Sequence, residues 1–140
     1  MNPQFEERSC LLRKSLVGNA LFSTLSGLTI LLAQGWVLRV LGLSKDIGLS
    51  ILGVGLLVFA APLVINARRQ QIKTADAWIA VLMDSAWVLG SCVLILVAPL
   101  STGGKWVVGV VSDVVLVFAV LQFLGIRRIQ ESEKFGSSTV

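Results

Sequence analysis

Residues 75–100 read ADAWIAVLMDSAWVLGSCVLILVAPL, and this stretch decides the fold. Between Ala77 and Leu100 its only charged residue is Asp84. At about 1.5 Å per residue, a helix of this length crosses the hydrocarbon core of a bilayer, which is about 30 Å thick. A charged group there costs about 2.5 to 3.5 kcal/mol, so Asp84 must face protein or water and not lipid. The stretch therefore predicts a transmembrane helix that needs neighbouring helices.

The whole chain has the composition of a membrane protein. Of its 140 residues, 55% are hydrophobic and 14% are charged, whereas an average soluble domain carries about 25% charged residues. The net charge of +4 is compatible with nucleic-acid binding. However, basic residues next to membrane spans are also what the positive-inside rule requires. We therefore expect the lipid bilayer as a partner, and no nucleic acid.

The hydropathy pattern predicts an all-α fold, an integral membrane four-helix bundle with short loops and a single transmembrane domain over residues 1–140. The expected elements are an interfacial helix at 2–14, spans at about 16–34, 47–67, 77–98 and 106–126, and a polar, disordered tail at 129–140. Residues 35–43 either continue the first span or lie along the interface, where Trp36 and Arg39 are well placed.

The distribution of Lys and Arg predicts the orientation of the spans. Nine of the twelve basic residues lie before the first span, in the connection at 68–73 or after the fourth span. The other three, Arg39, Lys45 and Lys105, lie in the two remaining connections. Both termini and the middle connection are therefore expected in the cytoplasm.

A weak internal repeat relates the second and fourth spans. Residues 57–60 and 116–119 both read LVFA, and an Arg pair follows each at the same distance. With a shorter loop in the second half, Asn19 aligns with Asp84 and Ser26 aligns with Ser91. Parallel duplication of a helical hairpin is one explanation. The other is that such residues are common at the end of any span.

Every predicted span has one face of small and polar residues, the kind of face that packs against other helices in a membrane. These faces supply a candidate intramembrane polar site, which comprises Asp84, Asp113, Ser91, Asn19, Ser23, Ser26 and Asn66. Two small pairs, Ser23 with Gly27 and Ala86 with Gly90, are expected to be exposed to a partner helix.

Asp84 and Asp113 admit two interpretations. Their expected depths in the membrane differ by roughly 8 Å. They are therefore expected to be two separate acidic sites along the interior of the bundle and not to share a proton. They belong either to a hydrated pathway or ligand site, or to simple helix packing, where such a hydrogen bond contributes about 0.6 kcal/mol. Gln122 follows Asp113 by nine residues, which places it on the opposite helix face, and it is expected to contact a second protein.

The sequence lacks the motifs of enzymatic chemistry. It contains no histidine, no CxxC pair, no phosphate-binding glycine loop and no GxSxG. We therefore predict that the protein is not an enzyme and has no catalytic residue, no cofactor and no metal.

Two runs carry a resemblance to a known group of proteins. Residues 19–28, NALFSTLSGL, and residues 84–91, DSAWVLGS, resemble small, largely uncharacterised bacterial four-span membrane proteins. The resemblance covers nearly the whole chain and implies the bacterial inner membrane, but no activity. The four spans are also similar to those of the small multidrug resistance transporters, but the first span here lacks their acidic residue.

Two functions remain open from the sequence. The first is a non-enzymatic accessory, assembly or binding subunit, with another membrane protein or a second copy as its partner. The second is a small proton- or cation-coupled transporter that uses Asp84 and Asp113. The absence of a soluble domain favours the first, and the two intramembrane acids favour the second.

Overall fold

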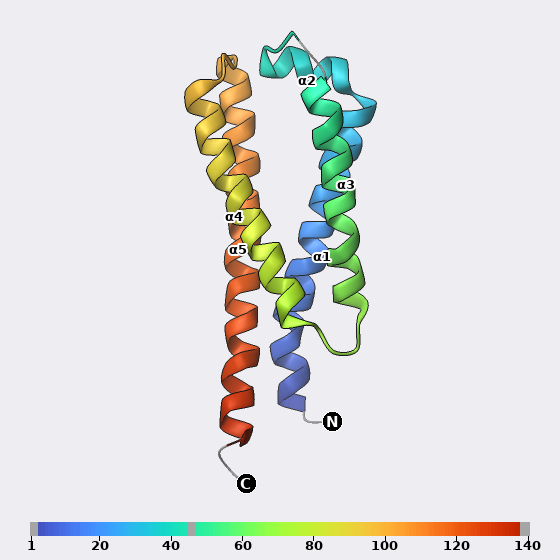
Figure 1. Ribbon diagram of the computed structural model, residues 1–140, viewed down its shortest axis with the longest axis vertical. Helices are drawn as coiled ribbons and strands as arrows, with labels where there is room; N and C mark the ends of the chain where they lie inside the picture. Colours follow the sequence, from blue (N-terminus) through green and yellow to red (C-terminus); the bar gives the residue numbers. More distant parts are fainter. Residues whose placement is uncertain (1–2, 45–46, 138–140) are drawn as a thin grey trace.

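The computed structural model describes residues 3–44 and 47–137 (Figure 1). Its helices are α1 (Pro3–Leu32), α2 (Gln34–Leu41), α3 (Ile47–Arg68), α4 (Thr74–Val97) and α5 (Thr102–Ser137). Four of them contain segments long and apolar enough to cross a membrane: Cys10–Leu32, Gly48–Arg68, Thr74–Val97 and Thr102–Glu131. The described residues form no strand, and the predicted all-α four-helix membrane bundle is confirmed.

The first and last helices are longer than the sequence pattern predicted. α1 is continuous through Lys14 and Ser15, so residues 3–14 extend the first span and form no separate interfacial helix. No proline or glycine interrupts the chain at that point, and nothing forces a break. α5 likewise continues to Ser137, so the expected disordered tail is helical from 129 to 137. Residues 2 and 138–140 lie outside the described residues.

The short helix α2 lies across one end of the bundle (Figure 1), and it does not continue the first span. The chain leaves the helical conformation at Ala33, where φ is −115° and ψ is 31°. Gly42 ends α2 with a φ of 75°, a value that favours glycine, and the next N–H group donates to the Leu38 carbonyl at 3.0 Å.

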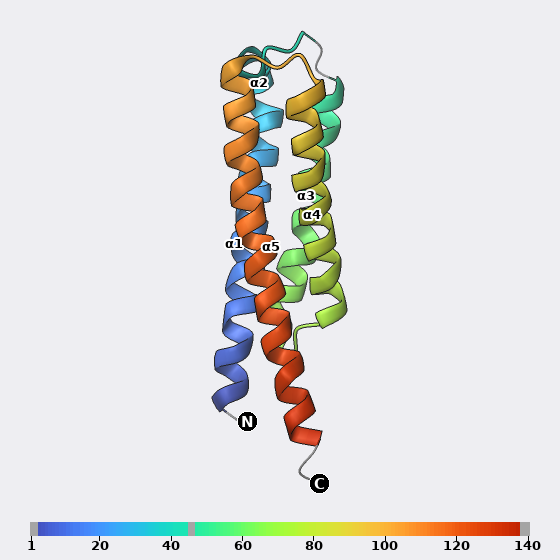
Figure 2. The same ribbon diagram turned by 90° about the vertical axis from the view of Figure 1, so that its left-hand side faces the viewer.

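The four long helices form two hairpins, α1 with α3 and α4 with α5. Figure 2 shows that α1 and α5 lie on one side of the bundle and α3 and α4 on the other. Within the first hairpin the backbones approach closely, since a Cβ atom at Gly27 would lie 2.8 Å from the carbonyl oxygen of Gly53. Ser23 and Gly27 are therefore buried inside this hairpin, and the prediction that they contact an outside partner is wrong.

The hairpins pack tightly at the end that carries both termini, which we call the terminal end. Leu12 and Leu16 of α1, Ile126 of α5 and Ala77 and Ala80 of α4 are buried in one apolar core there. Toward the other end, the α2 end, the hairpins diverge (Figure 1). The bundle is therefore wedge-shaped.

At the α2 end, Ser101 forms hydrogen bonds between the two hairpins, beside a small apolar cluster of Leu41, Leu49 and Leu100. The N–H group of Ser101 donates to the carbonyl oxygen of Leu41 at 3.0 Å, and its hydroxyl donates to the carbonyl oxygen of Val40 at 2.6 Å. These bonds fasten the α4–α5 connection to α2.

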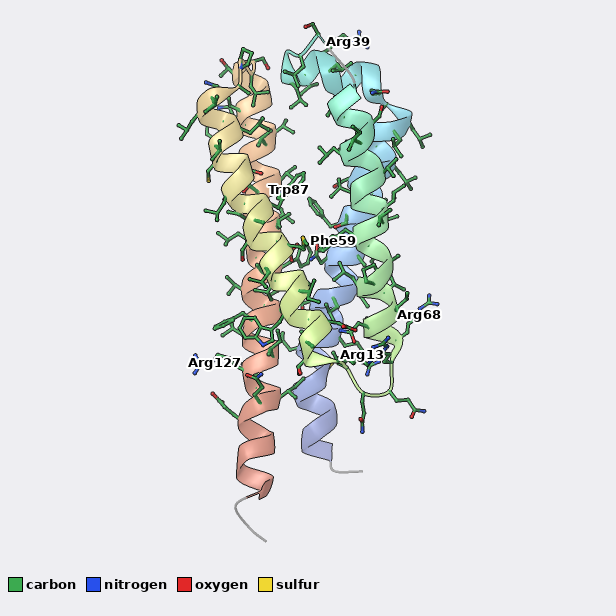
Figure 3. The ribbon with its side chains drawn as sticks, in the orientation of Figure 1. Arg13, Arg39, Phe59, Arg68, Trp87 and Arg127 are labelled. Atoms are coloured by element: carbon green, nitrogen blue, oxygen red, sulfur yellow. The ribbon has the colours of Figure 1, made fainter. Side chains whose placement is uncertain are left out.

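At the terminal end, Arg13 fastens α1 to the connection between the hairpins. Its guanidinium donates to the carbonyl oxygens of Ala67 at 2.6 Å and Arg69 at 3.0 Å. Charge-assisted bonds of this kind satisfy the carbonyl groups that a helix leaves free at its C-terminus. Arg13, Arg68 and Arg127 all lie toward the terminal end, whereas Arg39 lies at the α2 end (Figure 3).

Candidate functional site

Asp84 lies at the boundary between the packed core and the open part of the wedge. It belongs to the buried face of α4, which also includes Ala77, Ala80, Val81 and Ser91. Its side chain is only 2% exposed. Ala77 and Ala80 precede it within the apolar core, so Asp84 is the first polar group on this face beyond that core.

Two amide side chains hold the carboxyl group of Asp84. Asn19 Nδ2 of α1 donates to Asp84 Oδ2 at 2.6 Å, and Gln122 Nε2 of α5 donates to the same oxygen at 3.2 Å. Ser23 Oγ extends the network by donating to Asn19 Oδ1 at 3.4 Å. Asn19 and Gln122 are 1% and 0% exposed. The polar cluster thus joins three helices and both hairpins.

Gln122 corrects the expectation formed from the sequence. It does not contact a second protein but lies at the centre of the bundle and binds Asp84. The half-turn between Gln122 and Asp113 was a sound inference from helical geometry. Helical geometry does not decide which of the two residues faces the interior of the bundle. In the structure, that residue is Gln122.

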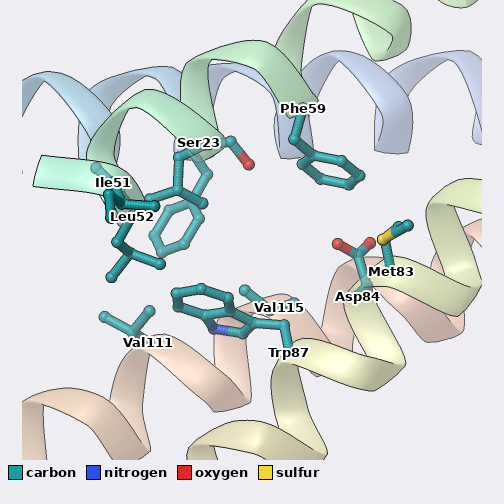
Figure 4. Close-up of a pocket in the computed structure, with 13 residues that line it drawn as sticks. Ser23, Ile51, Leu52, Phe59, Met83, Asp84, Trp87, Val111 and Val115 are labelled. Carbon is teal, nitrogen blue, oxygen red and sulfur yellow. The ribbon is translucent and has the colours of Figure 1, made fainter. Parts of the chain in front are cut away.

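A cavity of about 310 Å³ opens directly in front of Asp84. Its walls are mostly apolar and include the rings of Phe22, Phe59 and Trp87, while Ser23 and Ser26 add hydroxyl groups. Figure 4 shows the carboxyl group of Asp84 and the rings of Phe59 and Trp87 directed into this space. The carboxyl group is therefore a polar group in a pocket whose walls are mainly aromatic and aliphatic.

A larger cavity of about 890 Å³ continues from the first toward the α2 end. The two cavities share lining residues, among them Phe22, Ser26 and Trp87, so they form one connected space. Trp36 and Leu41 of α2 line its far end, and Ser91 lies along its wall. The space runs from α2 to Asp84.

Some polar atoms at this site have no partner. Among the described residues, the buried atoms Trp87 Nε1 and Gln122 Oε1 make no hydrogen bond, and the amide donors of Asn19 and Gln122 both reach only one oxygen of Asp84. A buried donor or acceptor without a partner costs about 1 to 3 kcal/mol. Trp87 lines both cavities with its ring, while its Nε1 atom is itself buried.

The structure brings together five of the seven predicted site residues. Asn19, Ser23 and Asp84 belong to the hydrogen-bonded cluster, and Ser26 and Ser91 line the connected cavities.

Asn66 lies elsewhere and has a structural role. Its Nδ2 donates to the Lys73 carbonyl oxygen at 3.1 Å, and its Oδ1 accepts from the Lys73 N–H group at 3.0 Å. It thus closes the α3–α4 connection and takes no part in the cluster.

Asp113 departs furthest from its predicted position. It is exposed on the outer face of α5 and lines neither cavity. Of the two acidic sites expected along the interior of the bundle, only Asp84 therefore faces that interior. An interior-facing Gln122 excludes an interior-facing Asp113 on the same straight helix.

The acid–base chemistry of the site rests on one carboxyl group. No group of three His, Cys, Asp or Glu side chains that could hold a metal ion occurs in the part of the chain that the structure describes. Within residues 3–44 and 47–137, Asp84 is the only ionisable side chain lining the connected cavities. One carboxyl group in an apolar space can attract a cation or exchange a proton.

Comparisons of the chain with protein-family models, with curated proteins and with solved structures found no match. The resemblance to bacterial four-span membrane proteins therefore stays a prediction, and the functional argument rests on the geometry around Asp84.

The first prediction concerns the hydrogen bonds of Asp84. In Asp84→Asn the amide oxygen still accepts from Asn19 and Gln122, so we expect little change in stability. In Asp84→Ala both buried amides lose their acceptor, and we expect a loss of about 1 to 3 kcal/mol. Unfolding of the detergent-solubilised variants by heat or by a denaturing detergent measures the difference. Equal stability of Asp84→Ala and the wild type would show that the cluster does not hold the helices together.

Proposed function

We propose that the protein is a non-enzymatic membrane protein that binds a hydrophobic organic cation in the cavity in front of Asp84. One observation carries the proposal: a buried carboxyl group, held by two amides, borders an apolar cavity. A binding role of this kind belongs to the class of accessory or binding subunits expected from the sequence.

The lining residues support the charge and the character of the ligand. Among the described residues, no Lys or Arg side chain lines either cavity, which disfavours an anion. The rings of Phe22, Phe59 and Trp87 border the space beside Asp84, and aromatic faces attract organic cations. The volumes of about 310 and 890 Å³ lie within the range of small-molecule sites, about 300 to 1,000 Å³.

Tetraphenylphosphonium, a hydrophobic monovalent cation, is a suitable probe for the second prediction. We expect Asp84→Asn to weaken its binding by about ten- to a hundredfold, since a contact to a charged group contributes about 1.5 to 3 kcal/mol. Wild-type affinity should also fall as the pH is lowered, because protonation of Asp84 removes the attracting charge. Equilibrium dialysis of the purified protein in mild detergent measures both effects.

Asp113→Asn is the matched control, because it makes the same chemical change to the other intramembrane acid, away from the cavity. It should bind the probe as the wild type does, with the same pH dependence. If Asp84→Asn and the wild type bind the probe equally, the proposed site is wrong.

Transport is a second candidate, favoured by the wedge shape of the bundle. A cavity lies between the hairpins on the α2 side of Asp84, and the hairpins pack together on its terminal side (Figure 1). A transporter that alternates between two open states has such a form when its central site is accessible from one side.

Uptake of the aromatic cation ethidium into liposomes under an imposed pH gradient tests this candidate. Proton-coupled transport predicts uptake by the wild type and its loss in Asp84→Asn, because an amide cannot exchange a proton. Binding without uptake would leave the protein a binding subunit.

We also propose that the protein resides in the bacterial inner (plasma) membrane with both termini in the cytoplasm. The support is the accumulation of basic residues at the terminal end, where Arg13, Arg68 and Arg127 lie (Figure 3).

Single cysteines at exposed loop positions test this orientation in a variant that lacks Cys10 and Cys92. Gln70→Cys lies in the α3–α4 connection and Thr102→Cys at the α2 end, and both native side chains are exposed. In intact cells, a membrane-impermeant maleimide should label Thr102→Cys and not Gln70→Cys. The reverse pattern would overturn the orientation.

A further inference from the structure

The connected cavities are elongated along the bundle, and their charged group lies at one end. Asp84 lines the smaller cavity, beside the packed core and near the middle of α4. From there the lining of α4 continues to Leu94, ten residues or about 15 Å further along the helix. Trp36 and Leu41 of α2 line the far end, and both lie beyond the candidate membrane spans. A cation that fills this space is therefore long and carries its charge at one end.

Beyond Asp84 the walls of the space are almost wholly apolar. Among the described residues that line the larger cavity, the side chains with hydroxyl groups are Ser26, Thr29 and Ser91. The hydroxyl group of Thr29 already donates to the Leu25 carbonyl oxygen of its own helix at 2.8 Å. Such a wall suits a hydrocarbon chain, because it offers no partner to a second charged group.

Three glycines keep the α3 and α4 walls free of side chains. Gly48 and Gly55 of α3 and Gly90 of α4 line the cavities, and a Cβ atom at any of them would meet nothing within 4 Å. At Gly27 and Gly53, by contrast, a Cβ atom would lie 2.8 Å from an atom of the facing helix. Glycine destabilises a helix relative to alanine, and close helix packing does not account for the first three. Their effect is to widen the cavity along its length.

We propose that the ligand bound at Asp84 is a single-chain alkylammonium amphiphile, with its ammonium group at the carboxylate and its alkyl chain extended through the larger cavity toward α2. This inference rests on the proposed function, because it assigns the shape of the cation bound there. The rings of Phe22, Phe59 and Trp87 border the position of the ammonium group (Figure 4), and aromatic rings are the usual partners of quaternary ammonium groups. An anionic amphiphile would instead place a second negative charge beside Asp84.

The bound amphiphile is inverted relative to its position in a bilayer. An amphiphile dissolved in a membrane keeps its charged group at the interface, because charge is costly at the bilayer centre, and its chain end lies in the hydrocarbon. At Asp84 the charged group lies near the middle of a span, and the chain end lies beside Trp36, beyond the spans. The position of the chain end therefore distinguishes binding from partitioning into lipid.

Tryptophan quenching tests this placement in the full-length protein, reconstituted in phosphatidylcholine nanodiscs. The probe is dodecyltrimethylammonium with a bromine atom on its terminal carbon, which quenches a tryptophan that it contacts. Trp36 and Trp106 are a matched pair, since they are 58% and 72% exposed and, of the two, only Trp36 lines the cavity. We expect saturable quenching in the wild type and in Trp106→Phe, and its loss in Trp36→Phe.

Saturable quenching that persists in Trp36→Phe would place the chain end elsewhere and overturn the proposal. Its absence from the wild type would overturn the proposal too, and the binding of tetraphenylphosphonium then shows how much has failed. If tetraphenylphosphonium binds, the site at Asp84 stands and takes a cation of another shape. If it does not bind, the proposed function fails as well.

A side chain added to the wall of the larger cavity gives a second test. We expect Gly90→Leu to weaken saturable binding of the probe by about tenfold or more, because the leucine side chain overlaps the path of the alkyl chain. Gly109→Leu is the control, since Gly109 also has open space at its Cβ position but lines neither cavity. It should bind the probe as the wild type does. Equal affinities of Gly90→Leu and the wild type would show that the chain does not extend along α4.

Discussion

A carboxyl group at membrane depth must find hydrogen bonds within protein, and this requirement organises the bundle around Asp84. Asn19 comes from one hairpin and Gln122 from the other, and both donate to one oxygen of Asp84. The cluster therefore sets the rotation of α1, α4 and α5 about their axes, which apolar packing alone does not specify in a membrane. It also lies between the packed core and the cavity, so that one network joins the helices and forms part of the cavity wall.

The spans were predicted well because few backbone conformations can cross the hydrocarbon core of a membrane. Backbone groups in hydrocarbon must be paired within a helix, so long apolar runs bounded by charges identify helices reliably. The two helix ends that were predicted wrongly, at residues 3–14 and 129–137, are polar. Polarity shows where a chain leaves the hydrocarbon, but it does not show where the helix stops.

The candidate site was only partly predictable, and the reason is physical. In a soluble helix the buried face is the apolar one, whereas in a membrane both lipid and the bundle interior accept apolar side chains. α5 is apolar on nearly every side, and its polar residues Asp113 and Gln122 lie half a turn apart. Their order of burial depended on a partner, Asp84, in another helix. Asn19 and Asp84, which the repeat aligned, meet at 2.6 Å, but aligned positions of a repeat need not touch, and the duplication stays a prediction.

The fastening of the bundle is uneven along its length. At the terminal end, the guanidinium of Arg13 donates hydrogen bonds at the connection between the hairpins, and an apolar core lies beside it. At the α2 end, the two bonds of Ser101 link α2 to the other hairpin beside a smaller apolar cluster of Leu41, Leu49 and Leu100, and a cavity lies between this cluster and Asp84. Local opening requires least free energy where buried contacts are fewest. The bundle is thus packed at both ends and least packed in between, so the width of the cavity is the dimension of the molecule that changes at the lowest cost in free energy.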